Sequence, residues 1–278
     1  MTDSKVVFTD ISESSEAGTF LGAEISRSFK SRRPDALIVF ASSKYDHSQL
    51  LEAIERACRP KIIVGCSSAG EFISNTLGEG SACAVALRAP EMHFAAGIGN
   101  HLRADRAAAA EQIVSSFVGL NDHNYSFHSA LVLTDALAGH ADDLVERLNL
   151  LTAGTYSLFG GGAGDDARFS RTHVFYGTEA YPDAAVALEI LSNKPVGVGV
   201  SHAWEPTGAP MRVTEAEGMR LISLNASPAV EIFQEHAEVT GQRFELEDPM
   251  PFFLHNVIGI STGDGYKLRV PLAVNPDG

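Results

Sequence analysis

One pattern of strand, helix, strand and glycine turn occurs twice in this amino-acid sequence. Residues 36–71 align without a gap on residues 130–165, at an offset of 94. Both segments end in alanine, glycine and an acidic residue: Ala69, Gly70 and Glu71, and Ala163, Gly164 and Asp165. Because recurrence at a fixed period marks a repeated structural unit, the chain is predicted to contain a duplicated α/β unit. The two glycine turns are then expected to line a pocket between the halves.

The similarity continues beyond the glycine turns. Residues 84–87 recur as residues 185–188 at an offset of 101, so the second copy contains seven additional residues (101 against 94). Each copy is predicted to turn back there in a hairpin. The returning strands are predicted at residues 92–99 and 196–202, which share a Gly-apolar-Gly triplet.

Apolar periodicity and capping residues predict the individual elements. The first copy is expected to contain strand 6–9, helix 14–29, strand 36–40, helix 50–57, strand 61–64 and the glycine turn 65–70. The second is expected to repeat this order as helix 105–117, strand 130–134, helix 142–151, strand 156–159 and turn 160–164. Strands that alternate with helices pair in parallel, whereas hairpins add antiparallel strands, so an α/β fold with mixed sheets is predicted.

The pattern changes after residue 204, where prolines and glycines interrupt the chain. A hairpin is predicted from residues 211–214 and 221–224, and a helix begins at Pro228. Strand candidates follow at residues 252–260 and 266–270. The predicted domains are a duplicated domain at 1–224, with repeats at about 14–100 and 104–204, and a partial C-terminal α+β segment at 225–278. Because the turn at 275–278 has no partner strand after it, we expect the chain to stop within a domain.

Composition narrows the classes of function. A formal charge of −14 and a pI near 5.1 argue against the binding of polyanions, including nucleic acid, because no basic stripe is available to replace counterions on phosphates. Membrane insertion is not expected either, since no apolar run approaches the roughly 18 residues that span a bilayer. The cysteines Cys58, Cys66 and Cys83 are odd in number and lack metal-ligand spacing, so a reduced cytoplasmic setting is expected.

Four short segments together resemble a known family. They are Val-Gly-Cys-Ser-Ser-Ala-Gly-Glu at 64–71, Gly-Gly-Gly-Ala-Gly-Asp at 160–165, Val213-Thr214 and Pro228-Ala229. Their order and separation resemble the FIST sensory domain of bacterial signal-transduction proteins. The resemblance covers about residues 17–229 as the N-terminal FIST part and includes only the start of the C-terminal FIST part.

This resemblance implies a noncatalytic sensor that acts through a histidine kinase or a cyclic-di-nucleotide signalling protein. It also implies a small ligand, such as an amino acid or another carboxylate, and no cofactor. The NosP-type branch of the family is similar and binds haem as a nitric-oxide sensor, so a haem sensor is the alternative. The chain departs from the family because the later C-terminal region, with its own Cys and Arg motif, is absent.

The ligand site is predicted at the two glycine turns, because backbone N–H groups at strand and helix ends bind carboxylates and phosphates. The alternative is that the glycines only allow tight turns and close packing. The predicted ligand-binding residues are Cys66, Ser67, Ser68, Gly70, Glu71, Gly161, Gly162, Gly164 and Asp165. Neither turn matches the dinucleotide fingerprint or a P-loop.

Other chemistry is less well supported by the sequence. An enzyme would use Cys66 or Ser67 as its nucleophile, but Ala69 stands where a nucleophile elbow requires glycine. Asp165, Asp166 and Glu71 form a candidate carboxylate cluster for a metal, without a supporting histidine or cysteine motif. No catalytic and no metal-binding residue is therefore predicted.

Haem would need an axial histidine in an apolar pocket. His202 is the candidate, because it ends a predicted apolar strand beside Trp204; His173 and His255 also lie in apolar runs. No c-type attachment motif is present, so any haem would be held noncovalently.

Overall fold

The computed structural model describes residues 2–122, 124–263 and 265–275. The chain forms two compact units, Met1–Gly199 and Val200–Gly278. Among the described residues, no helix combines the length and the apolar composition needed to cross a membrane.

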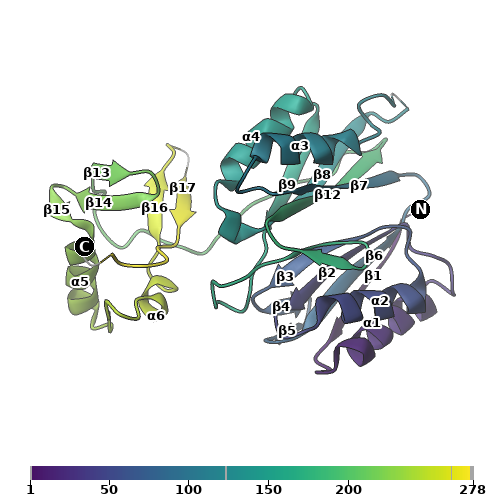
Figure 1. Ribbon diagram of the computed structural model, residues 1–278, viewed down its shortest axis with the longest axis horizontal. Helices are drawn as coiled ribbons and strands as arrows, with labels where there is room; N and C mark the ends of the chain where they lie inside the picture. The colour runs from purple at the N-terminus through teal and green to yellow at the C-terminus, as the bar shows by residue number, and fades with distance from the viewer. Residues whose placement is uncertain (1, 123, 264, 276–278) are drawn as a thin grey trace. The chain divides into compact units, whose positions relative to one another are not determined.

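The first unit contains a six-stranded mixed sheet, here called the first sheet (Figure 1). In hydrogen-bonding order its strands are β1 (Asp3–Thr9), β6 (Ala82–Arg88), β2 (Ala36–Ser42), β3 (Ile63–Ser68), β10 (Val174–Tyr176) and β11 (Glu179–Tyr181). The β2–β3 pair is parallel and the other pairs are antiparallel. Helices α1 (Ser14–Ser28) and α2 (His47–Cys58) cover one face, where Leu21 and Ile54 pack against Val39 in one apolar cluster.

The second sheet has four strands, in the order β7 (His93–Asn100), β12 (Ala184–Ser192), β8 (Phe127–Thr134) and β9 (Tyr156–Gly162). Its pairings are antiparallel, antiparallel and parallel, which is the same series as β1-β6-β2-β3 in the first sheet. Helices α3 (Arg106–Ser115) and α4 (Ala141–Leu151) pack on its outer face together with a short 3-10 turn, η1 (Ala136–Ala138). The two halves therefore share one order of elements, while their common ancestry stays a prediction.

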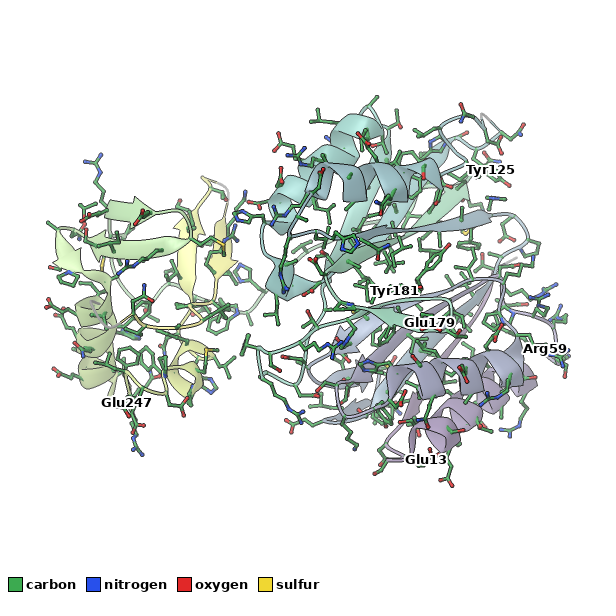
Figure 2. The ribbon with its side chains drawn as sticks, viewed as in Figure 1. Glu13, Arg59, Tyr125, Glu179, Tyr181 and Glu247 are labelled. Atoms are coloured by element: carbon green, nitrogen blue, oxygen red, sulfur yellow. The ribbon has the colours of Figure 1, made fainter. Side chains whose placement is uncertain are left out.

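The two sheets pack face to face, with a pair of helices on each outer side, so the first unit has four layers (Figure 1). One apolar cluster fills the space between the sheets and includes Val64 from β3 and Leu188 from β12. Tyr181 of β11 packs against the same cluster (Figure 2). The predicted α/β fold with mixed sheets is confirmed.

Capping residues fix where the helices begin. Asp46 is the N-cap of α2: its Oδ1 accepts a hydrogen bond from the Gln49 backbone N–H at 3.0 Å. The Gln49 side chain donates back to Asp46 Oδ2 at 2.8 Å, so the helix starts at His47, three residues before the predicted position.

The two hairpins predicted to follow the glycine turns, one in each copy, are wrong. β6 is paired with β1 on one edge and with β2 on the other, so it has no free edge for the following strand. β7 instead crosses to the second sheet, where it pairs with β12. β12 is likewise paired on both edges, and residues 196–202 form no strand.

The faces of the strands also differ from the ungapped alignment. Val39 of β2 and Val132 of β8 both face the outer helices, and Val132 lies 93 residues after Val39. Their neighbours in β3 and β9 are Gly65 and Gly160, which are 95 residues apart. The ungapped alignment, at an offset of 94, is therefore one residue out of register in each of these two strand pairs. A shift of one residue exchanges the two faces of a strand, so the alignment matched residues of β2 and β3 to residues on the opposite face of β8 and β9.

Strands β3 and β9 extend into the predicted glycine turns, as far as Ser68 and Gly162. Two of these glycines are required by packing. A Cβ atom on Gly65 would lie 2.0 Å from the Val39 carbonyl oxygen, and one on Gly160 would lie 1.7 Å from the Val132 carbonyl oxygen. For these two positions the structure agrees with the alternative reading, in which glycine allows close packing.

The second unit is smaller and has its own core of Ala237, Phe252 and Phe253. It contains β13 (Val213–Glu217), β14 (Arg220–Leu224), β15 (Ser227–Pro228), α5 (Ala229–Thr240), α6 (Met250–Phe253), β16 (Ile258–Ser261) and β17 (Tyr266–Arg269). The predicted hairpin of β13 and β14 is confirmed. The predicted strand at 252–260 is wrong at its start, because Phe252 and Phe253 turn into this core from a helix.

Candidate functional site

The two Ala-Gly-acid bends contact each other directly. The Gly164 backbone N–H donates to the Ser67 carbonyl at 2.8 Å, and the Asp166 N–H donates to the Ser68 carbonyl at 3.2 Å. A Cβ atom on Gly164 would lie only 2.9 Å from the Ala69 nitrogen, so glycine is needed for this approach. Residues 67–71 and 160–166, the paired bends, thus bring the sequence-predicted site residues of both halves together at the carboxyl ends of β3 and β9.

Glu71 anchors the first bend. Its side chain is 2% exposed and accepts hydrogen bonds from the Ser81 backbone N–H at 2.9 Å, the Ser81 hydroxyl at 2.8 Å and the Ser68 hydroxyl at 2.5 Å. Gly70, with φ of +89°, makes the left-handed turn that leads into the short hairpin of β4 (Glu71–Ile73) and β5 (Thr76–Gly78). The Glu71 carboxylate therefore fixes the loop, and its oxygens face protein donors.

Asp165 has the same role in the second bend. Its carboxylate is 4% exposed and accepts the backbone N–H groups of Phe169, Ser170 and Arg171 at 2.9, 2.7 and 2.9 Å. Burial opposes ionisation of Asp165, but these hydrogen bonds outweigh it and lower the pKa of the carboxyl below its ordinary value. Asp165 is therefore ionised and committed to holding the loop 165–171.

Asp166 connects the second bend to the first sheet. Its Oδ2 accepts the Ser43 N–H and the Ser42 hydroxyl, both at 2.9 Å, as well as the Ser43 hydroxyl. Asp166 has a left-handed φ of +56°, which is unfavourable for a residue with a side chain. The three hydrogen bonds hold this conformation at the carboxyl end of β2.

Cys66 and Ser67 are interior residues. Cys66 is 3% exposed between the sheets, and burial, together with Cys83, raises the pKa of its thiol to about 12. The thiol is therefore protonated at neutral pH and is not an activated nucleophile. The Ser67 hydroxyl, fully buried, accepts the His173 backbone N–H at 2.9 Å and donates to the His173 carbonyl at 3.3 Å.

The exposed residues of the paired bends are Ala69 and Gly160 together with Gly161 and Gly162. Gly161 and Gly162 end β9, which stands at the edge of the second sheet with β8 as its single strand neighbour among the described residues. The corresponding edge of β3 is covered by β10, which pairs with it from Val64 to Cys66. A Cβ atom on Gly161 would meet no heavy atom within 4 Å, so there is open space beside this backbone.

Two histidines lie beside the bends: His173, which the sequence offered only as a candidate haem ligand, and His47, which sequence reasoning missed. The rings of His47 and His173 lie with centroids 5.4 Å apart. Burial, followed by the charges of His47 and Arg171, lowers the pKa of His173 to about 4, so the ring is neutral at neutral pH. Its Nδ1 is buried without a hydrogen-bond partner among the described residues.

Asp135 is a further residue that sequence reasoning missed. It follows β8 directly, is 3% exposed, and accepts the backbone N–H groups of Leu137 at 2.9 Å and Asp183 at 2.8 Å, as well as the Thr172 hydroxyl. A signal was present for Asp135 and for Ser42: polar residues directly after parallel strands collect at one edge of a sheet.

The candidate haem ligand His202 is exposed in the second unit, where its Nδ1 accepts the Trp204 backbone N–H at 3.3 Å. His255 is exposed as well. An axial haem ligand lies in an apolar pocket, so the surroundings of these two side chains do not fit the group. Among the described residues, no group of three or more His, Cys, Asp or Glu side chains is arranged to hold a metal ion.

Comparison with known protein families matches residues 35–227 to the FIST N domain. No curated protein matches the chain. The matched segment extends from the start of β2 to β15 and contains both bends, and it confirms the family expected from the four short segments. The chain belongs to the FIST family, whose members are small-ligand sensory domains of signal transduction.

Proposed function

We propose that this protein is a noncatalytic sensor that binds a small carboxylate, such as an amino acid, at the paired bends. The observation that carries the proposal is the direct contact between the bends, in which Gly164 N donates to the Ser67 carbonyl at 2.8 Å while the backbone beside Gly161 stays open. A ligand held there touches both halves of the first unit.

The backbone at the end of β9 supplies the binding groups. On the free edge of β9, opposite β8, glycine N–H groups meet a carboxylate without a side chain in the way. Glu71, Asp165 and Asp166 are occupied by protein donors, so they shape the bends and leave recognition to the backbone and the adjoining hydroxyls.

Ligand binding is coupled to conformation through the hydrogen bonds of Gly164 and Asp166 that join the two halves, here called the seam. Asp166 and Gly164 join the bend after β9 to the ends of β2 and β3, so a ligand that favours one arrangement of this seam shifts the population toward it. The receiving protein is a histidine kinase or a cyclic-di-nucleotide signalling protein in the cytoplasm. Family membership supports this choice.

The test is a thermal-shift screen of amino acids and small dicarboxylates. At least one ligand is expected to raise the melting temperature, since a ligand at 100 times its Kd stabilises the folded state by about 2.7 kcal/mol. Gly161→Leu fills the open space and should abolish the shift. Gly197→Leu is the matched control, because a Cβ atom there also meets nothing within 4 Å. An equal rise in melting temperature in both variants would contradict the proposed site. If no ligand raises the melting temperature of the parent chain, the proposed function is wrong.

The proposal includes no haem. Adding haemin to the purified protein is expected to give the absorption spectrum of free haemin without a saturable shift of the Soret band. A saturable shift that is lost in His202→Ala, His173→Ala or His255→Ala would favour the nitric-oxide sensor instead.

A further inference from the structure

A second polar region lies at the other end of the first sheet, where β2 and β3 begin. Three connections meet there: α1 to β2, α2 to β3, and β6 to β7. They enclose a cavity of about 540 Å³ whose charged lining residues are Arg32, Arg33, Asp35, Lys61 and Arg88. Since β2 spans seven residues, this cavity is about 20 Å from the paired bends at its other end.

The charge of the cavity is opposite to that of the whole chain. Four cationic side chains and one carboxylate line it, although the chain has a formal charge of −14. The Arg33 Nε–H donates to the Arg59 carbonyl at 2.7 Å. Because a carbonyl is neutral, this contact does not neutralise the guanidinium charge of Arg33. Arg32 and Arg88 each form an ion pair with Asp3 Oδ2, at 3.6 and 3.7 Å, so one carboxylate is shared between two guanidinium groups. Figure 2 shows Arg59 at the end of α2.

Asp35 organises the cavity. Its backbone N–H donates to the Leu87 carbonyl at 2.7 Å, and its carboxylate accepts the Ala89 N–H at 2.8 Å and pairs with Lys61 Nζ at 2.7 Å. Burial opposes ionisation of this carboxyl, but the Lys61 and Ala89 hydrogen bonds and the nearby charges lower its pKa. One side chain thus ties the three connections together, and its charge is neutralised by Lys61.

The connections are held in unusual backbone conformations. Lys30, Ser31 and Arg59 have φ of +53°, +59° and +48°, in the left-handed region that residues with a side chain seldom occupy. The Ser31 N–H bonds to the Ser26 carbonyl at 2.8 Å, and the Lys61 N–H bonds to the Pro34 carbonyl at 3.0 Å. Such strain concentrates where a chain is shaped to present groups to a ligand.

We infer that this cavity is a binding site for a small organic polyanion that carries two or more phosphate or carboxylate groups. Guanidinium groups bind such anions in a bidentate way, and the volume is that of a typical small-molecule site. Pro90 and Met92 add an apolar wall for the rest of the ligand. The site is separate from the paired bends.

The test is calorimetric titration of the full chain with pyrophosphate and, separately, with citrate. At least one of the two should bind, and its affinity should fall as salt is raised from about 10 mM to about 200 mM. Binding of pyrophosphate alone assigns a phosphate ligand, and binding of citrate alone assigns a carboxylate ligand. If neither anion binds, the inference is wrong.

Two variants locate the binding. Arg33→Gln and Arg32→Gln should each weaken binding about tenfold or more, because each removes charge-assisted hydrogen bonds. Arg56→Gln is the matched control: it removes the same charge from α2, at a side chain that is 63% exposed and paired with Glu52 outside the cavity. An equal loss of anion affinity in Arg56→Gln would show that the anion responds to the net charge of the chain, and would contradict a site in the cavity. Gly161→Leu should leave the affinity unchanged, and loss of binding in that variant would contradict a separate site.

Discussion

Hydrogen-bonded carboxylates follow the parallel strands in the second half of the first unit. Asp135 follows β8, and Asp165 and Asp166 follow β9, and each accepts backbone N–H groups from a loop. A buried carboxylate that is fully hydrogen-bonded stabilises a loop, whereas an unpaired one is costly. These side chains therefore give the paired bends a fixed shape, on which the proposed binding by the glycine backbone depends.

Stability should depend on pH through His173. Its pKa is about 4 in the folded chain and near 6.5 when unfolded, so between these values the unfolded state binds more protons. The free energy of unfolding should therefore fall as pH is lowered from 6.5 to 4. The pKa of His47 is lowered by burial as well, so His47 adds to the same fall.

Urea unfolding of His173→Gln between these pH values should show a shallower fall than the parent chain. Asp165 and Asp35, whose pKa values lie below the ordinary 3.8, add to this fall below about pH 5, where their carboxyls in the unfolded state begin to bind protons. They do so equally in the parent chain and in the variant, so the difference between the two slopes reports on His173. His93→Gln, which changes an exposed side chain on β7, is the control. A slope in His173→Gln as steep as in the parent chain would contradict the assignment.

The sequence was sufficient to predict that the two bends lie together, because each Ala-Gly-acid triplet follows a predicted strand of the repeated unit. It was not sufficient to predict the partners of those bends. Ser43 and His173 reach the site through pairing between residues more than 100 positions apart in the chain, such as Ser43 with Asp166. No local pattern carries information on such contacts.

At the scale of elements, strand type was predictable and strand pairing was not. Residues 89–92 join β6 to β7, and a connection this short is typical of a hairpin. The chain instead changes sheets there, because β1 and β2 already occupy both edges of β6. The glycine turns were predicted too long for the same reason. Gly65 and Gly160 belong to strands β3 and β9, and only the pairing of these strands shows this.

Adjacent glycines of β9 should respond differently to substitution. Gly160→Ala is expected to destabilise the fold by about 3 kcal/mol, because its Cβ atom would lie 1.7 Å from the Val132 carbonyl oxygen and its φ is +154°. Gly161→Ala should change stability by less than about 1 kcal/mol, because its Cβ atom meets nothing within 4 Å. The free energies of unfolding in urea measure both, and similar values for the two variants would contradict the described path of β9.

At the scale of the molecule, the first unit carries two separate polar regions at opposite ends of one sheet. The paired bends join the carboxyl ends of the strands of both halves, and the cationic cavity collects the connections at the amino ends of β2 and β3. The connection from β6 to β7 lines the cavity and is also the covalent link between the halves. The paired bends thus lie where the halves meet, whereas the cavity is lined by the first half and by the connection that leads to the second.

The most direct measurement is an amide NMR titration of the full chain with an amino acid that has a single carboxylate and raises the melting temperature. We predict that the largest shift changes fall on Ser68, Gly161, Gly162 and Gly164, from both halves of the first unit, while Arg33 and Lys61 change little. Changes confined to other residues, or to one bend only, would contradict a ligand site built from the two halves.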